Sequence, residues 1–110
     1  MLSRPVTPRS AELVGRHLWV MSQPVRVRMI DALERMGEAS VGDLAAAVEI
    51  SRHDASQHLA ILKRAGLVRR RRSGRLGLYQ LVEPGRLMAI YDEVAADLHD
   101  RARNAADELL

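Results

Sequence analysis

The chain contains no cysteine and no phenylalanine, and its aromatic residues are limited to one tryptophan and two tyrosines. The lack of cysteine excludes a disulfide framework, a thiolate metal site and a thiol redox switch. With so few aromatic residues, the core must be built from Leu, Val, Ile, Ala and Met. This composition favours packed helices over a β-sandwich, whose strands prefer aromatic and β-branched residues.

Long hydrophobic runs are also missing. No apolar segment approaches the roughly 20 residues that a membrane-spanning helix needs. The opening residues, MLSRPVTPRS, contain two prolines in place of the apolar stretch of a signal peptide. We therefore expect a cytoplasmic protein with no membrane partner. The 110 residues fit one domain, and we expect residues 1–9 to form a flexible arm ahead of a domain over 10–110.

No group of residues in the sequence has the spacing of a catalytic site. The four histidines are scattered, and neither a Ser-His-Asp arrangement nor a pair of carboxylates stands out. A glycine-rich loop of the kind that cradles phosphates is absent as well. We therefore expect the protein not to be an enzyme and to need no cofactor.

The net charge of +3 is unevenly distributed along the chain. Between Ser51 and Arg75, eight Lys or Arg residues stand against Asp54 alone, so this stretch carries a charge of +7 and the remainder carries −4. Such segregation indicates a polyanionic partner. A solvated charged face is the alternative interpretation of the same residues.

Apolar spacing and capping residues predict four helices in the first 65 residues. Two pairs, Ser40 with Asp43 and Ser51 with Asp54, have the spacing of a helix N-cap and its third residue. Pro24 fits a first helical turn. The expected helices span residues 10–21, 24–36, 40–48 and 51–65. The last two are short and separated by a turn of about three residues, which is typical of a helix-turn-helix.

The rest of the chain predicts a β-hairpin and a final helix. Strand-like runs over 67–72 and 77–82 flank a turn containing Gly74, and the first strand and the tip carry five arginines. Side chains alternate along a strand, so Arg69 to Arg72 cannot all face one side. A helix beginning near Pro84 carries apolar residues every three or four positions, close to a heptad seam. We therefore predict a mainly α fold with a β-hairpin, a winged helix-turn-helix of order α-α-α-α-β-β-α.

Polar residues gather at the start of the helix expected over 51–65. A reading helix contacts base edges in the major groove with this end, where Arg can pair with guanine and Gln with adenine. The basic wing over 67–82 suits the DNA backbone or the minor groove. The predicted contacts to double-stranded DNA are Ser51, Arg52, His53, Ser56, Gln57, Lys63, Arg70, Arg72 and Arg75.

A winged-helix module that docks on another protein is the alternative function. The charge of +7 in one stretch argues against it, because protein–protein interfaces are not usually so single-signed. The reading helix and the basic hairpin together are more specific to DNA binding than either feature alone.

Four segments resemble the ArsR-type (arsenic-repressor-like) family of winged-helix transcriptional regulators. They are QPVRVRMI at 23–30, SRHDASQHL at 51–59, LKRAGLV at 62–68 and GLYQL at 77–81. The resemblance covers about residues 10–100. It implies a homodimeric repressor that binds an inverted-repeat operator in a promoter and is released by an inducer. It also implies a dimer interface formed by the first and last helices, with Leu13, Leu18, Leu87, Tyr91, Val94, Leu98 and Ala102 as candidate contacts.

The metal sites of this family do not carry over to the sequence. The family's thiolate site lies on the helix expected over 40–48, SVGDLAAAV, which has no cysteine. On the last helix, the positions three or four residues from His99 are alanines and an arginine. We therefore predict no metal site and an inducer other than a thiolate-bound metal. An intersubunit metal site involving His17 or His99, and an unknown small-molecule effector, are the alternatives.

Overall fold

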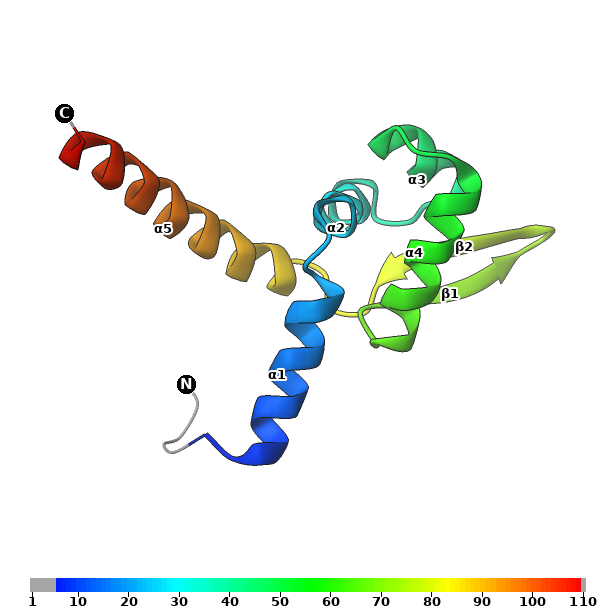
Figure 1. Ribbon diagram of the computed structural model, residues 1–110. Coiled ribbons are helices and arrows are strands. Elements are labelled where there is room, and N and C mark those ends of the chain that lie inside the picture. The colour runs from blue at the N-terminus through cyan, green and yellow to red at the C-terminus, as the bar shows by residue number, and fades with distance from the viewer. Residues whose placement is uncertain (1–5, 110) are drawn as a thin grey trace.

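A computed structural model of the chain describes residues 6–109, which form five helices and a two-stranded antiparallel hairpin (Figure 1). The predicted order of elements and the winged helix-turn-helix fold are confirmed. The elements are α1 (Pro8–Val20), α2 (Pro24–Met36), α3 (Val41–Val48), α4 (Arg52–Arg64), β1 (Val68–Ser73), β2 (Leu76–Leu81) and α5 (Arg86–Glu108).

Helix α1 begins two residues earlier than the sequence pattern indicated. The side chain of Thr7 caps it by accepting a hydrogen bond from the backbone N–H of Ser10 at 3.1 Å. Pro8 occupies the first turn, where its missing N–H is no loss, so the helix begins inside the segment expected to form the arm. The arm expected over 1–9 falls partly on residues 1–5, which lie outside the described residues, as does Leu110 at the end of the predicted domain.

The predicted caps set the limits of the helix-turn-helix. The hydroxyl of Ser40 accepts from the N–H of Asp43 at 3.2 Å, and that of Ser51 accepts from the N–H of Asp54 at 3.0 Å. Between the two helices, Glu49 takes a left-handed conformation with φ of 59°. These local contacts confirm the expected starts of α3 and α4 and make the turn between them tight.

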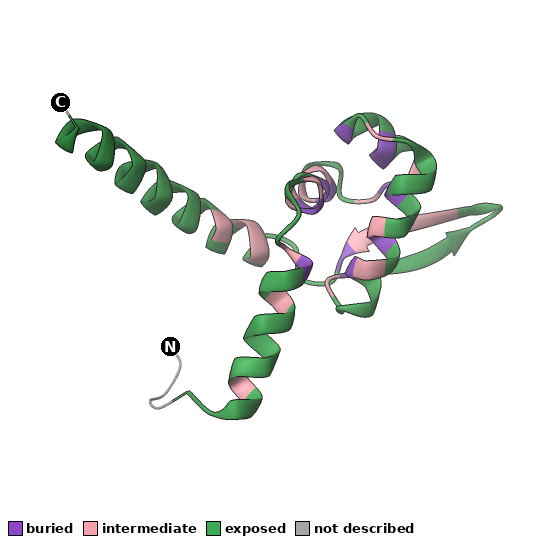
Figure 2. Cartoon of the chain, in the orientation of Figure 1, coloured by how far each residue is buried: buried purple, intermediate pink, exposed green. Residues whose placement is uncertain are grey.

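The hydrophobic core lies between α2, α3, α4 and the base of the hairpin (Figure 2). Helix α1 has only one buried residue, Val20, and α5 has none. Both helices project away from this compact body in Figure 1. The largest fully buried side chains are Met29, Ile30, Leu33, Leu44, Leu59 and Leu62.

The hairpin is attached to the body through a short bridge. Tyr79 and Ala39 exchange two backbone hydrogen bonds, of 2.8 and 3.0 Å, so that the link between α2 and α3 pairs with β2. Strand β1 begins and ends one residue later than expected, and β2 begins and ends one residue earlier. Ser73 pairs with Leu76 across a turn formed by Gly74 and Arg75. None of the helices over residues 6–109 combines the length and hydrophobicity that a membrane crossing requires.

Candidate nucleic-acid interface

The N-terminal end of α4 displays the polar residues that the sequence predicted for base contacts. Ala55, Leu59 and Leu62 are buried, and these three residues fix which face of the helix points inward. The opposite face is left open to solvent at the end where free backbone N–H groups and the positive end of the helix dipole attract phosphate. The exposed residues there are Ser51, Arg52, His53, Ser56 and Gln57.

Arg52 also reaches across the helix-turn-helix. A Cβ atom placed on Gly42 of α3 would lie 3.6 Å from Nε of Arg52, so the arginine side chain runs close beside that glycine. Gly42 is not among the site residues predicted from the sequence. Lys63, in contrast, lies in the last turn of α4, 11 residues beyond Arg52, about 16 Å along the helix axis. The structure therefore does not bring Lys63 together with the other predicted residues of α4.

The wing arginines divide between the two faces of the hairpin. The register pairs Arg70 with Tyr79 and Arg72 with Gly77, which places both arginines on the face that also carries buried Val68. The guanidinium of Arg70 lies over Gly77, where an added Cβ would come within 2.2 Å of Nε. The lack of a side chain at Gly77 therefore leaves room for Arg70 to cross the hairpin.

Arg75, the last of the predicted DNA contacts, lies at the tip of the wing. Arg72 donates from Nε to the carbonyl of Gly74 at 3.1 Å, and Arg75 is exposed in the turn. Arg70, Arg72 and Arg75 are all exposed to solvent, as a phosphate contact requires. Their roles at DNA stay predictions.

Arg71 forms an ion pair with Glu38. Its Nη2 donates to Oε1 of Glu38 at 2.7 Å and its Nε donates to Oε2, so the pair is bidentate. The Arg71 hydrogen bonds lower the pKa of Glu38, and Glu38 in turn raises the pKa of Arg71. This pair ties the wing to the segment between α2 and α3, a role for Glu38 that sequence reasoning missed.

We expect R71Q to raise the pKa of Glu38 towards its ordinary value of about 4.3. The folded-state pKa of Glu38 lies below its ordinary value. The pair therefore stabilises the folded protein fully at pH values above the ordinary pKa of Glu38. This stabilisation is lost as the pH falls through the lowered pKa. NMR titration of the side-chain carboxyl measures the shift, and R69Q on the same strand is the matched control. An unchanged titration in R71Q would contradict the pairing.

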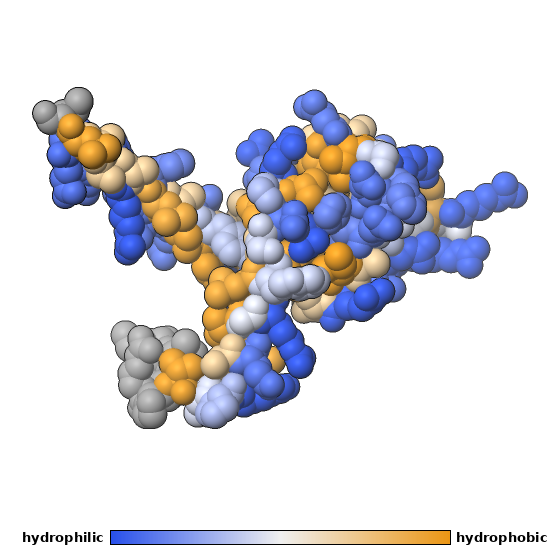
Figure 3. Space-filling model, in the orientation of Figure 1, coloured by the Kyte–Doolittle hydropathy of each residue, from blue (hydrophilic) through white to orange (hydrophobic). Residues whose placement is uncertain are grey.

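The predicted dimer residues form an exposed apolar surface on α1 and α5. Leu13, Leu18, Val94 and Leu98 are each about half exposed or more. Figure 3 shows apolar side chains following the length of α5. Exposed apolar surface of this extent is uncommon on a monomer and marks an interaction site. Leu87 and Tyr91 are half-buried near the body, and Ala102 is exposed.

The two candidate metal ligands lie apart. His17 is half-buried, and its Nε2 lies 2.6 Å from Oη of Tyr91, which joins α1 to α5. Burial raises the pKa of Tyr91. His99 is exposed far along α5. Within residues 6–109 of one chain, no three His, Asp or Glu side chains gather closely enough to hold a metal ion. The prediction of no metal site, and the alternative of a site between subunits, both stay untested.

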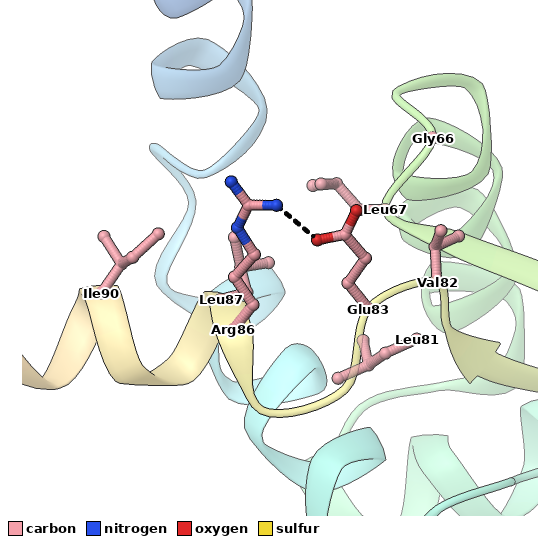
Figure 4. Close-up of a pocket in the computed structure, with 8 residues that line it drawn as sticks. All are labelled: Gly66, Leu67, Leu81, Val82, Glu83, Arg86, Leu87 and Ile90. Atoms are coloured by element: carbon pink, nitrogen blue, oxygen red, sulfur yellow. Dashed lines mark hydrogen bonds and ion pairs between the residues drawn. The ribbon is translucent and has the colours of Figure 1, made fainter. Parts of the chain in front are cut away.

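A small apolar recess lies where the hairpin base meets the start of α5 (Figure 4). Its volume is about 190 Å³. Arg86 donates to Glu83 at 2.8 Å beside it, so the only charges lining the recess are already paired with one another. The lining residues are Gly66, Leu67, Leu81, Val82, Glu83, Arg86, Leu87 and Ile90.

Comparison with known proteins places this geometry among bacterial regulators. Residues 23–70 match the family described as "Bacterial regulatory protein, arsR family". The chain is similar to a transcriptional repressor SmtB homolog of Synechocystis sp., with 37% identity over 90 residues. That match covers 82% of this chain and 67% of the relative, so the chain spans about two thirds of the relative's length.

Two solved structures extend the likeness over most of the chain. The crystal structure of Rv0081 from M. tuberculosis is 32% identical with a TM-score of 0.71, covering 91% of this chain and 99% of its own. The solution structure of Mb0332 from Mycobacterium bovis, described as a homodimeric winged helix-turn-helix DNA-binding domain, is 28% identical with a TM-score of 0.74. It covers 90% of this chain and 95% of its own.

Proposed function

Because the chain belongs to the ArsR family of bacterial regulatory proteins, we propose that it is a homodimeric transcriptional repressor that binds an inverted-repeat operator in double-stranded DNA. The observation that carries this proposal is the exposed polar end of α4 beside a basic wing, both attached to a packed hydrophobic core. The names of its relatives, a repressor and a DNA-binding domain, support the same function.

In this proposal α4 is the reading helix. Arg52 and Gln57 contact base edges in the major groove, because an arginine can donate two hydrogen bonds to guanine and a glutamine can match adenine. Ser51 and the free N–H groups at the start of α4 bind a phosphate. The wing arginines add phosphate contacts, which contribute affinity but carry no sequence information.

Dimerisation supplies the second half of the operator contact. The exposed apolar residues of α1 and α5 from two chains would cover one another and remove that surface from water. A two-fold dimer presents two reading helices to half-sites about one turn of DNA apart. The inducer is not a metal held by thiolates of this chain, since the chain has no cysteine. Its chemical class is left open.

The proposed function predicts preferred binding to DNA from upstream of the protein's own gene. A fluorescent fragment of that region and a random duplex are compared by anisotropy over a salt series. We expect tighter binding to the upstream fragment and a steep fall in affinity with salt, because several phosphate contacts release counterions. Equal affinity for the two fragments would contradict operator recognition, and failure to bind either at low salt would favour the protein-docking alternative.

A further inference from the structure

Arg26 is the only buried charged residue among residues 6–109, with 4% of its surface exposed. None of the ion pairs in this part of the chain includes it, so its charge has no carboxylate partner there. Burial lowers the pKa of Arg26. Burying a cation costs free energy unless polar groups surround it. The neutral groups that contact Arg26 must therefore stabilise its charge.

Those neutral groups come from two other helices. Nε of Arg26 donates to the carbonyl of Val20, the last residue of α1, where the helix dipole is negative. Its guanidinium lies over the ring of Trp19, 5.6 Å from the ring centroid. On the other side, Nη1 lies 3.2 Å from Nδ1 of His58 in α4. Arg26 itself stands in the first turn of α2, so its side chain joins α1, α2 and α4.

The contact with His58 has a defined direction. A guanidinium can only donate hydrogen bonds, so Nδ1 of His58 must accept this one. The imidazole is therefore unprotonated at Nδ1 and carries its proton on Nε2. His58 directly follows Ser56 and Gln57, two of the α4 residues predicted to contact DNA.

Helix α1 has few other attachments to the body. Val20, whose carbonyl Arg26 binds, is the only buried residue of α1. The hydrogen bond between His17 and Tyr91 connects α1 to α5 instead of to the core. A movement of α1 relative to the core therefore acts directly on Arg26, and through it on His58.

We propose that Arg26 is a positioning residue that ties the dimerisation helix α1 to the reading helix α4 through His58. This inference rests on the proposed function, because it assigns those two roles to α1 and α4. Arg26 does not touch DNA. It sets the orientation of α4 relative to the dimer, and a two-fold operator demands that orientation because both reading helices must fit their half-sites together.

The test uses R26M, H58A and H58N in the full chain. R26M removes the charge and its hydrogen bonds at similar length, and R35M on the exposed face of the same helix is the matched control. H58A removes the acceptor of the Arg26 hydrogen bond. In H58N, the side-chain oxygen occupies a position close to that of Nδ1 and can accept this hydrogen bond again. Dimerisation is measured by sedimentation, folding by circular dichroism, and binding by anisotropy with upstream and random DNA.

We expect R26M and H58A to remain folded dimers and each to bind the upstream fragment about tenfold more weakly, the size expected for losing one hydrogen bond to a charged group. H58N and R35M should bind like the unmodified chain. Because both single changes break the same link, the double variant R26M/H58A should lose no more than either one. Losses of affinity that add in the double variant would instead indicate two independent structural effects.

Two outcomes separate this inference from the function it rests on. Preferred binding by the unmodified chain, with unchanged affinity in H58A or with additive losses in the double variant, would overturn the coupling alone. Equal binding of the unmodified chain to both fragments would overturn the proposed function. If R26M does not fold, H58A and H58N still decide the coupling. Nitrogen-15 spectra of the His58 ring test the contact without DNA, since a protonated Nδ1 in the free protein would exclude it.

Discussion

V94E or L98E is expected to convert the dimer into monomers and to abolish operator binding. Val94 is 49% and Leu98 56% exposed in the single chain, on the apolar stripe of α5. A carboxylate there would be buried without a partner when two chains associate, and it would be introduced twice because the interface is two-fold. We expect the dimer dissociation constant to rise by about 100-fold or more.

Sedimentation velocity over a concentration series measures this change, and A96E provides the matched control. Ala96 is exposed and lies two positions from Val94, about 200° around the helix, so its glutamate should stay in solvent. Circular dichroism should show the same helix content in all three variants. A V94E chain that sediments as a dimer with full operator affinity would exclude the apolar stripe of α5 as the interface.

The features that the sequence predicted well are local ones. The capping serines Ser40 and Ser51 accept hydrogen bonds from N–H groups only three residues away. The start of each helix can therefore be predicted from a few consecutive residues. Pro24 occupies the first turn of α2 as expected, again a property of one position. Pro8 lies in α1 although residues 1–9 are expected to form an arm, because proline interrupts a helix interior but is tolerated in a first turn.

The features that sequence reasoning missed depend on contacts between distant segments. Arg26 lies 32 positions from His58, and Glu38 lies 33 positions from Arg71. The segment QPVRVRMI contains two arginines, as the solvated face of a helix often does. No neighbouring residue indicates that Arg26 is buried. The alternation of strand side chains predicted that Arg69 to Arg72 would divide between two faces. Which face meets Glu38 follows from how the Ala39–Tyr79 bridge docks the hairpin, and that geometry is not encoded locally.

The second large expected effect is a difference in DNA binding between variants of α4 and variants of the wing. R52A and Q57A are expected to weaken binding to the upstream fragment by about 10- to 100-fold, as loss of a base contact predicts. They should weaken binding to random DNA much less, because neither residue is assigned a phosphate. R70A, R72A and R75A should weaken both duplexes alike, and each should reduce the slope of log affinity against log salt by about 0.9.

These expectations follow from where the side chains stand. Arg52 and Gln57 project from the solvent face of a helix whose buried side is fixed by Ala55 and Leu59, so they can hold a defined orientation against base edges. The arginines of the hairpin extend from an exposed two-stranded ribbon, which suits a charge contact more than a directional one. Anisotropy with both duplexes over a salt series, with R35M as the control, separates the two classes. Equal losses on both duplexes for R52A and Q57A would remove the reading role from α4, whereas a changed preference in R75A would assign base or minor-groove recognition to the wing.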